Sequence, residues 1–487
     1  MIILKDILYK VAIEAVKGST DVVVHNIEFD SRKVESDDVF VAIRGAVSNG
    51  HDFIEKAIDL GATTVVCDEF PENIRPTVTY VLVKDTNTAM AYMAANYFDN
   101  PSHNLRLVGV TGTNGKTTIA SLLYQLFKKA GYKVGLISTV TILVDDKAYP
   151  ATHTTPDSLM LNYYLKQMNN EGVEFCFMEV SSHGIHQKRT NALTFAGGIF
   201  TNLSHDHLDY HKTFAEYRDV KKAFFDVLPK SAFALSNVDD KNGTLMLQNT
   251  AAKKLTYALK TYADYKAQIL ENQLSGLLLK INDNEVWVRL IGSFNAYNLL
   301  AIYGAAVELG LDNLEVLRLL SELESVSGRF QYIISQGNIT AIVDYAHTPD
   351  ALENVLNTIN DIRTKNEQLI TVVGCGGDRD TTKRPIMANI AAKSSDKAIF
   401  TSDNPRTEDP QSIIDEMEKG VEIQWQRKTL SVLDRKQAIK TACQLANSGD
   451  IILIAGKGHE TYQEINGVRH HFDDMETVTE ILTQLNK

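Results

Sequence analysis

The segment Thr111-Gly112-Thr113-Asn114-Gly115-Lys116-Thr117-Thr118 decides the fold of this chain. The apolar run 107–110 precedes it, and apolar residues at helical spacing follow it. A strand, a glycine-containing turn and a helix in this order predict a phosphate-binding loop, because backbone N–H groups and the positive helix N-terminus then face phosphate oxygens. We expect Lys116 to reach the β- and γ-phosphates of a nucleoside triphosphate and Thr117 to bind Mg²⁺. The helical stripe consists of Ile119, Leu122, Leu123, Leu126 and Phe127, and Gly131 is expected to end the helix.

The loop departs from the usual phosphate-loop pattern at one position. That pattern has a glycine where this chain has Val110, and the glycine that precedes the Gly115-Lys116 pair here is Gly112. An alternative interpretation is a structural glycine turn that happens to carry Lys116. The flanking strand and helix favour the phosphate-binding interpretation.

The same local order recurs along the chain: a short β-rich apolar run ends in a polar or glycine-rich loop, and a helical pattern follows. Repeated units of this kind predict an α/β fold with parallel sheets that carry helices on both faces. Ligands of such sheets bind beyond the carboxyl ends of the strands, where the unusual polar clusters of this chain fall. The apolar runs are 107–110, 174–180, 198–200, 341–343, 370–373, 398–400 and 451–454.

The chain has 487 residues, which is enough for about three domains. Pro101 follows a helical stretch at 89–98 and precedes the strand that enters the phosphate loop, so we place the first boundary there. The second boundary is placed at Gly328, between a helix expected at 314–322 and a strand pair expected around 331–343. The expected α/β domains are residues 1–100, 101–328 and 329–487.

Composition limits the classes of function. The net charge of −12 argues against broad nucleic-acid binding. No apolar run approaches the roughly 18 residues of a membrane span, and the N-terminus lacks a signal-peptide pattern, so we expect no membrane insertion. The cysteines are far apart, which argues against a zinc site or a disulfide framework and is typical of a reducing cytoplasm. They are Cys67, Cys176, Cys375 and Cys443.

An acid and a histidine stand near the expected phosphate site. Glu179 ends an apolar strand, so its burial is costly unless it is paired or bound to a metal. His207 follows another strand, and carboxylate and imidazole groups both bind divalent cations. Either residue taken singly could instead cap a loop or be a satisfied polar group of the core. Residue chemistry alone predicts that Lys221 and Lys222, about one helix downstream, are solvated.

Motifs in a fixed order resemble those of the Mur ligase family of peptidoglycan precursor synthesis, and the resemblance covers nearly the whole chain. The terminal motifs resemble the members that add 2,6-diaminopimelate to UDP-N-acetylmuramoyl-L-alanyl-D-glutamate. The central motifs are residues 111–118, 179–183, 202–209, 292–298, 328–331 and 344–349. The terminal motifs are residues 30–32 and 39–42 with Gly45 and Gly50, and residues 376–380, 403–406 and 456–460.

The resemblance implies a uridine-nucleotide domain of α/β type at the N-terminus, a central ATP-binding domain with a parallel sheet like that of phosphate-loop ATPases, and a Rossmann-like C-terminal domain for the amino acid. It implies that ATP phosphorylates the D-glutamyl carboxylate to an acyl phosphate, which the amine of the incoming amino acid attacks. It also implies two Mg²⁺ ions, one held by Thr117 and the other partly by Glu179 and His207. The family carbamylates one lysine; the corresponding position is Lys221, and Lys222 is adjacent.

The resemblance also assigns binding residues for both nucleotides. For ATP these are the phosphate loop from Gly112 to Thr118, with Asn295 and Asn298 near the adenine and Arg329 and Asp344 near the nucleotide. For the sugar-nucleotide dipeptide they are Ser31, Ala46, Val47, Ser48, His153, Thr154, Thr155, Ser181, Gln187 and Arg189.

The amino-acid pocket expected from the resemblance has to recognise a distal carboxylate and a distal amine. Arg406 offers the bidentate fork that suits a carboxylate, and Arg379 can do the same. Glu460, together with the backbone at Gly456, can accept hydrogen bonds from the ammonium. An alternative is that Arg406 pairs with Glu408 or Asp409 at the start of the next helix. The remaining pocket residues are Asp403, Asn404 and Pro405.

Other functions stay open at this point. The amino acid could be L-lysine, which lacks the distal carboxylate and would leave Arg406 without its partner. A folylpolyglutamate-type ligase would share the loop but not need the N-terminal domain or the 403–406 motif. A nucleotide switch or regulatory ATPase would leave the C-terminal motifs without a role. We expect a monomer that acts on small molecules.

Overall fold

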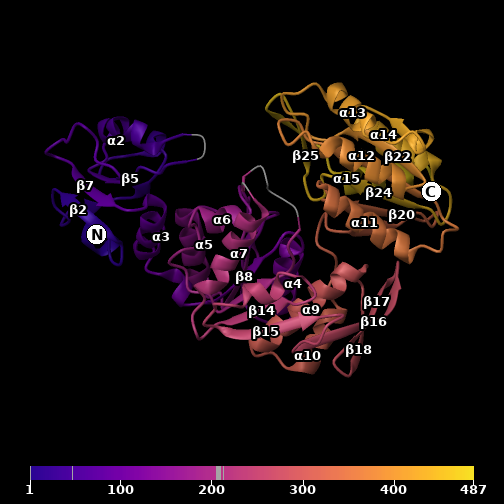
Figure 1. Cartoon of the computed structure of the whole chain (residues 1–487), viewed down its shortest axis with the longest axis horizontal. Helices are drawn as coiled ribbons and strands as arrows, with labels where there is room; N and C mark the ends of the chain where they lie inside the picture. The colour runs from indigo at the N-terminus through magenta and orange to yellow at the C-terminus, as the bar shows by residue number, and fades with distance from the viewer. Residues whose placement is uncertain (1, 46–47, 205–209, 212) are drawn as a thin grey trace.

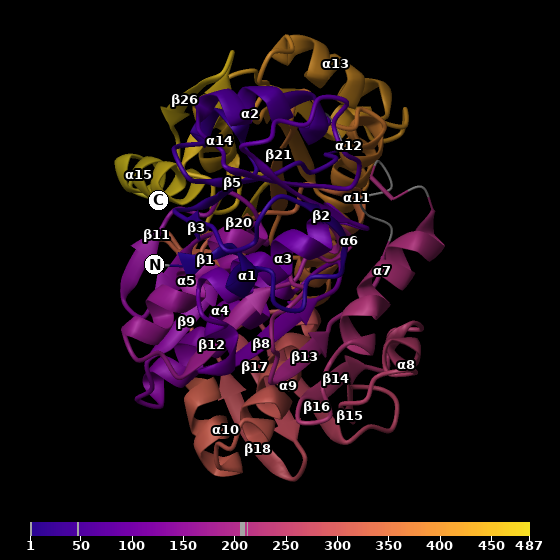
Figure 2. The ribbon, with the colours of Figure 1, turned by 90° about the vertical axis from the view of Figure 1, so that its left-hand side faces the viewer.

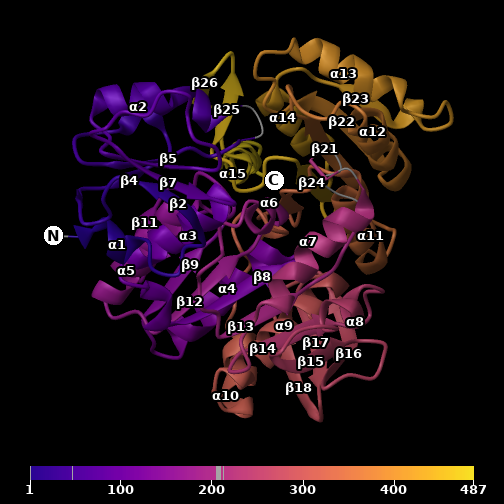
Figure 3. The ribbon, with the colours of Figure 1, turned by 60° about the vertical axis from the view of Figure 1, so that its left-hand side comes forward.

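The computed structural model describes residues 2–45, 48–204, 210–211 and 213–487. Figure 1 shows three lobes in chain order, indigo, magenta to pink, and orange to yellow. The N-terminal and C-terminal lobes stand on the same side of the central lobe in each of the three views (Figures 1, 2 and 3). No helix among the described residues is long and apolar enough to cross a membrane.

The N-terminal domain is built on a five-stranded sheet in the order β2-β7-β6-β5-β4. Strands β4 to β7 run parallel, and β2 is antiparallel at one edge. Separate apolar clusters cover the two faces. The strands are β1 (Ile2–Ile3), β2 (Ile13–Lys17), β3 (Val23–Val24), β4 (Ile27–Glu28), β5 (Val39–Val41), β6 (Thr64–Cys67) and β7 (Thr79–Val83), and the helices are α1 (Leu4–Ile7), η1 (Ser31–Lys33), η2 (Gly50–Phe53), α2 (Ile54–Leu60) and α3 (Thr86–Tyr97).

The central domain carries an eleven-stranded sheet in the order β11-β10-β9-β12-β8-β13-β14-β15-β16-β17-β18. The seven neighbouring strands β9, β12, β8, β13, β14, β15 and β16 pair in parallel, as the repeated units predict. The outer strands β10, β11, β17 and β18 form antiparallel pairs. The strands are β8 (Arg106–Thr111), β9 (Val134–Ile137), β10 (Ile142–Val144), β11 (Lys147–Tyr149), β12 (Phe175–Glu179), β13 (Gly197–Phe200), β14 (Phe233–Asn237), β15 (Lys253–Ala258), β16 (Tyr265–Gln273), β17 (Gly276–Ile281) and β18 (Asn284–Val288). The helices are η3 (Pro101–His103), α4 (Lys116–Lys129), α5 (Ser158–Asn170), α6 (Ser182–His186), α7 (Phe214–Asp226), α8 (Gly243–Met246), α9 (Ser293–Glu308) and α10 (Asn313–Ser321).

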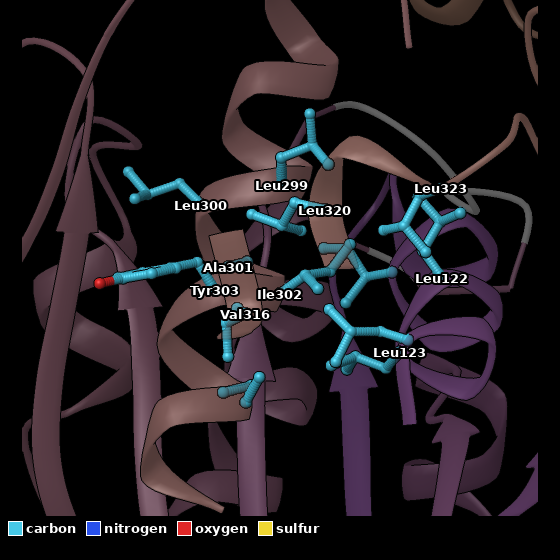
Figure 4. Packing of buried hydrophobic residues seen from close by; sticks show 14 of the residues in the cluster. Leu122, Leu123, Leu299, Leu300, Ala301, Ile302, Tyr303, Val316, Leu320 and Leu323 are labelled. Atoms are coloured by element: carbon cyan, nitrogen blue, oxygen red, sulfur yellow. The ribbon is translucent and has the colours of Figure 1, made fainter. Parts of the chain in front are cut away.

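The middle strands of the central sheet, β8, β9, β12, β13 and β14, are buried on both faces, which explains why they are almost wholly apolar. Along β8, Val108 and Val110 belong to the cluster beneath α4, α9 and α10, whereas Leu107 belongs to the cluster beneath α5 and α7. Figure 4 shows Leu122 and Leu123 of α4 beside the apolar residues of α9 and α10. Helix α4 ends as expected, since Gly131 follows it with a φ of 91°.

The C-terminal domain has a six-stranded sheet in the order β19-β20-β24-β21-β22-β23, in which only β19 is antiparallel. Apolar clusters again lie on both faces. The strands are β19 (Gln331–Ile334), β20 (Thr340–Asp344), β21 (Leu369–Cys375), β22 (Lys397–Ser402), β23 (Thr429–Ser431), β24 (Ile451–Ala455), β25 (Tyr462–Ile465) and β26 (Val468–His471), and the helices are α11 (Pro349–Ile362), α12 (Lys383–Ser394), α13 (Pro410–Lys419), η4 (Gln426–Lys428), α14 (Arg435–Leu445) and α15 (Asp474–Gln484).

Candidate active site

A cavity of about 560 Å³ lies where the central and C-terminal domains meet. Its walls come from the loops that follow β8, β12, β13 and β20, all of them carboxyl ends of parallel strands. The phosphate loop lines it from Thr113 to Thr118, and Asp344 to Thr348 line it from the C-terminal domain. The cavity therefore collects polar groups that are far apart in the sequence.

The glycines of the phosphate loop are required by close contacts. Gly115 begins α4 with a φ of 88°, and a Cβ there would lie 2.7 Å from Asn298 Oδ1. A Cβ at Gly112 would lie 1.9 Å from Thr201 Oγ1. Only glycine suits these two positions. The loop is therefore a tightly packed turn in its own right, although it lacks the glycine that the usual phosphate-loop pattern has at position 110.

Lys116 lies across the phosphate loop. Its Nζ donates hydrogen bonds to the carbonyls of Gly112, at 3.0 Å, and Thr113, at 2.8 Å. The ammonium is thus held over the N-terminus of α4, where an anionic phosphate is stabilised by the helix.

Thr117 and Glu179 face each other inside the cavity. Thr117 Oγ1 donates to Glu179 Oε1 at 2.9 Å, and the N–H of Thr139 donates to the same oxygen at 2.7 Å. Glu179 is 1% exposed. A hydroxyl and a buried carboxylate side by side are oxygen ligands of the kind that Mg²⁺ prefers. His207 lies outside the described residues, and within the described part no group of three or more His, Cys, Asp or Glu side chains is arranged to hold a metal.

The prediction that Lys221 and Lys222 are solvated is wrong. Helix α7 packs one face against the phosphate loop, so Lys221 is 1% exposed and its Nζ donates to the Gly112 carbonyl at 2.9 Å. The Lys221 ammonium also lies 4.7 Å from the centre of the Tyr217 ring. Lys222 is also buried but pairs with Asp226 at 2.7 Å. Of the two lysines, Lys221 is the one that lines the cavity.

Of the four residues expected near the nucleotide, three line the cavity and one does not. Asn298, Arg329 and Asp344 line the cavity, whereas buried Asn295 lies behind it and accepts a hydrogen bond from Asn298 Nδ2 at 3.0 Å. Arg329 Nη2 donates to Thr117 Oγ1 at 3.1 Å. The Asp344 carboxylate accepts backbone hydrogen bonds from Phe330 and Ala346, and burial raises its pKa.

The residues expected near the dipeptide form a network beside Glu179. Thr155 Oγ1 donates to the Glu179 carbonyl at 2.9 Å and accepts from the Ser181 N–H at 3.0 Å. Arg189 Nη1 donates to the Thr155 carbonyl, and Arg189 Nε donates to Gln187 Oε1 at 3.0 Å. Thr154 and Ser181 line the cavity, and His153, next to Thr154, is exposed.

The N-terminal residues are not part of this cavity. Ser31 is a buried residue at the start of η1, and Ser48 is exposed, with a carbonyl that accepts from the Gly45 N–H at 2.9 Å. Ala46 and Val47 lie outside the described residues. Among the described residues, every one that lines the cavity belongs to the central or C-terminal domain.

A second polar cluster lies beyond the carboxyl ends of β22 and β24; we call Asp403, Asn404, Arg406, Lys457 and Glu460 the amino-acid cluster. Asn404 Nδ2 donates to Glu460 Oε2 at 2.8 Å, and Lys457 Nζ donates to Asn404 Oδ1 at 2.9 Å. Burial and the neighbouring Asp403 carboxylate raise the pKa of Glu460. A Cβ at Gly456 would lie 2.6 Å from Asp403 Oδ2, so the loop needs glycine there.

Arg406 does not make the ion pair that the alternative interpretation required. Its Nη1 donates to the Gly377 carbonyl at 2.7 Å, while Glu408 pairs with Arg384 at 2.9 Å. Among the described residues, no ion pair joins Arg406 to Glu408 or Asp409. Arg406 has a φ of 53°, which is uncommon for a residue other than glycine and often marks functional sites. Arg379 is exposed, and Pro405, between Asn404 and Arg406, is buried.

A stack of side chains connects the cavity to the amino-acid cluster. The Arg329 guanidinium lies 4.6 Å from the centre of the Tyr345 ring, which lies 4.8 Å from that of His459. Burial lowers the pKa of His459 to about 3. The two sites are therefore neighbours in one interdomain region.

Sequence reasoning missed three residues of this region: Asp350, Tyr345 and Lys457. Asp350 Oδ2 accepts from Asn114 Nδ2 at 3.1 Å and from Ser204 Oγ at 2.8 Å, which joins the C-terminal domain to the phosphate loop. Each of the three lies in or next to a quoted motif. Position in the motif was the available signal, but the sequence did not show that these side chains point inward.

Comparison with known proteins agrees with this arrangement. Residues 23–99 match the Mur ligase family catalytic domain, 110–306 the Mur ligase middle domain, and 328–458 the Mur ligase glutamate ligase domain. A protein of Cytophaga hutchinsonii, UDP-N-acetylmuramoyl-L-alanyl-D-glutamate–2,6-diaminopimelate ligase, is 56% identical over 99% of this chain and 100% of its own length. The chain belongs to the Mur ligase family.

Other Mur ligases are similar over nearly the full length. The enzyme of the same name from Phocaeicola vulgatus is 54% identical over 98% of this chain and 99% of its own. A solved structure of a UDP-N-acetylmuramoyl-L-alanyl-D-glutamate–2,6-diaminopimelate ligase has a TM-score of 0.70 and 34% identity, and covers 100% of this chain and 99% of its own. The three-domain α/β fold predicted from the sequence is confirmed, and as a Mur ligase the protein is an ATP-dependent ligase.

Proposed function

We propose that the protein joins meso-2,6-diaminopimelate to the D-glutamate of UDP-N-acetylmuramoyl-L-alanyl-D-glutamate, with ATP converted to ADP and phosphate. The observation that carries this proposal is the full-length similarity to ligases of that name, at 56% and 54% identity. The reaction is a step of peptidoglycan precursor synthesis. We place it in the cytoplasm and expect a monomer.

ATP is proposed to bind in the interdomain cavity, with its phosphates over the loop Gly112–Thr118 and its adenine near Asn298, which Asn295 orients. Transfer of the γ-phosphoryl group to the D-glutamyl carboxylate gives an acyl phosphate and ADP. The amine of the incoming amino acid then attacks the acyl carbon, and phosphate leaves as the amide forms. Lys116 and Arg329 offset the negative charge that moves during the transfer.

The residues of the cavity suit Mg²⁺, since Thr117 Oγ1 and the buried Glu179 carboxylate lie 2.9 Å apart. Thr117, Glu179, His207 and Lys221 are the proposed holders, with Lys221 as a carbamate formed from its amine and CO₂ with loss of a proton. When bound, Mg²⁺ neutralises phosphate charge. The burial of Lys221 next to the Gly112 carbonyl supports its choice over Lys222.

The sugar-nucleotide dipeptide is proposed to extend from the N-terminal domain to the cavity. Ser31, with Ala46, Val47 and Ser48, would contact its nucleotide end. The network beside Glu179 would hold the peptide end, because Thr154 and Ser181 open onto the cavity. The residues proposed to hold the peptide end are His153, Thr154, Thr155, Ser181, Gln187 and Arg189. We also propose domain boundaries near residues 100 and 328.

Diaminopimelate is proposed to bind at the amino-acid cluster. Arg406, assisted by Arg379, would bind the distal carboxylate. Glu460 and Asp403 would bind the distal ammonium near Gly456. Asn404 and Pro405 would lie on either side of the amino acid. The Arg406 guanidinium donates to a carbonyl and not to a nearby acid, which leaves its charge for the substrate. L-Lysine has no group to meet that charge, so we expect it to be a poor substrate.

Omission of single substrates tests the proposal. Purified protein is incubated with ATP, Mg²⁺, the UDP-dipeptide and diaminopimelate, and ADP and the UDP-tripeptide are measured by chromatography and mass spectrometry. We expect both products only in the complete mixture. ADP formation that is independent of the dipeptide and the amino acid would contradict a ligase function.

A further inference from the structure

Lys457 is a buried cation of the amino-acid cluster. Its side chain is 0% exposed. Burial of an ammonium is costly unless it is paired and hydrogen-bonded. The ammonium meets that requirement through Asn404 Oδ1 at 2.9 Å and Glu460 Oε2 at 3.4 Å.

The hydrogen bonds of Asn404 have a defined direction because of Lys457. Asn404 Oδ1 accepts from two donors, Lys457 Nζ and the backbone N–H of Glu464, each at 2.9 Å. A flipped amide would place its NH₂ group against both of these donors. The amide nitrogen is therefore directed to Glu460 Oε2, at 2.8 Å.

Glu460 is left with one oxygen for a ligand. Oε2 accepts from both Asn404 and Lys457. Within the described part of the chain, Oε1 receives no hydrogen bond from the protein. A carboxylate with one oxygen anchored and the other open suits a substrate ammonium, whose N–H groups all donate.

We propose that Lys457 is a positioning residue for the amino-acid substrate: it fixes the Asn404 amide, anchors Glu460 Oε2 and keeps Glu460 anionic, so that Oε1 receives the distal ammonium of diaminopimelate. This inference rests on the proposed function and adds a residue to its specificity site. Burial and Asp403 both raise the pKa of Glu460, and Lys457 opposes them. Loss of Lys457 therefore favours a neutral Glu460, which binds an ammonium less strongly.

The test compares Lys457→Met, which removes the charge and the donors at similar length, with Lys457→Gln, which keeps a donor and removes the charge. We expect the KM for diaminopimelate to rise about 10- to 100-fold in Lys457→Met, as for loss of a hydrogen bond to a charged group, and by a smaller factor in Lys457→Gln. The KM values for ATP and the UDP-dipeptide, and kcat at saturating diaminopimelate, should stay near those of the wild type. Lys436→Met, which removes an exposed lysine of the same domain, is the matched control.

A double variant with Glu460→Gln gives a second readout. Because both residues act on the same ammonium, adding Lys457→Met to Glu460→Gln should raise the KM for diaminopimelate much less than Lys457→Met does alone. An unchanged KM for diaminopimelate in folded Lys457→Met, an equal rise in all three KM values, or additive effects in the double variant would overturn the inference. If Lys457→Met does not fold, as judged by circular dichroism, an unchanged KM in Lys457→Gln overturns it.

The outcome for the wild type separates the inference from the proposed function. A wild-type protein that forms no ADP in response to diaminopimelate would contradict the proposed function. An active wild type with an unaffected Lys457→Met variant would contradict only the role of Lys457.

Discussion

The phosphate-loop region and the amino-acid cluster both lie beyond the carboxyl ends of parallel strands, but they hold their charges differently. In the phosphate loop, the ammonium groups of Lys116 and Lys221 donate to backbone carbonyls of the loop itself. In the amino-acid cluster, Lys457 and Glu460 form a buried network through Asn404.

This difference matches the ligands proposed for the two regions. The carbonyls of the loop are neutral, and the anionic phosphates of ATP would offer these ammonium groups charge-assisted hydrogen bonds, which are stronger. A cluster with ordered positive and negative groups suits a ligand that carries both charges at fixed positions. Under the proposed function, the phosphate-loop region accounts for the use of ATP and the amino-acid cluster accounts for the choice of amino acid.

The largest effect is expected in the phosphate loop. Lys116→Met should lower kcat by about 1,000-fold or more, because a charge contact to the transferring phosphoryl group is lost. Steady-state ADP release measures this, with Lys129→Met, a half-exposed lysine of the same helix, as the control. A variant that keeps more than a tenth of kcat would show that the loop lysine is not used in this way.

A smaller but more selective effect is expected in the amino-acid cluster. Arg406→Ala should raise the KM for diaminopimelate about 100-fold, since a charge-assisted bidentate contact is lost, while the KM for ATP stays unchanged. Arg427→Ala, in η4 of the same domain, is the control. Retained preference for diaminopimelate over lysine in Arg406→Ala would separate Arg406 from specificity.

The charge of Glu460 should appear in the pH dependence of the wild type. The pKa of Glu460 is raised, so as the pH falls its carboxyl becomes neutral earlier than that of an exposed glutamate, and the KM for diaminopimelate should rise by up to about tenfold per pH unit. The charged and titratable groups around it are Asp403, Lys457, Tyr345, Tyr462 and Arg435.

Kinetics at a series of pH values give this profile, and the KM for ATP serves as an internal reference. Glu460→Gln, which cannot titrate at this position, should flatten the rise. An identical profile in Glu460→Gln would assign the pH dependence to another group.

The smallest effect concerns the contact between the phosphate-loop region and helix α11 of the C-terminal domain. Asp350→Ala removes the acceptor of hydrogen bonds from Asn114 and Ser204. We expect a rise of about three- to tenfold in the KM for ATP, because partly exposed polar contacts contribute little individually. Asp361→Ala, at the other end of α11, is the control, and an equal effect in both variants would argue against a specific link.

The fold was largely predictable because each apolar run is a strand buried on both faces. Each of the seven runs coincides with a strand of the parallel parts of the sheets to within two residues at either end. The helices expected at 89–98, 119–127 and 314–322 correspond to α3, α4 and α10. The antiparallel strands at the edges of the central sheet were not predicted. Strands such as β10 and β11 have three residues each, too few for a periodic pattern to be read.

The residues that line the site could be predicted where a sequence motif fixes the backbone conformation. They were harder to predict where a side chain reaches the site only because distant segments bury it. Residues 113–118 of the phosphate loop and Glu179 line the same cavity. The burial of Lys221 and Lys457 was not predictable from residue chemistry, because it results from packing between distant segments and no local pattern distinguishes these lysines from solvated ones. The assigned roles of the site residues stay predictions until the variants are measured.

The amino-acid cluster is proposed to select diaminopimelate, whereas the phosphate loop is proposed to supply the phosphoryl transfer from ATP. The most direct test measures kcat/KM for meso-diaminopimelate and for L-lysine on the purified wild-type protein, with ATP and the UDP-dipeptide saturating. We predict a preference of at least about 1,000-fold for diaminopimelate, since a site that uses a buried polar contact rejects the analogue that lacks it. Equal kcat/KM values for the two amino acids would contradict the account.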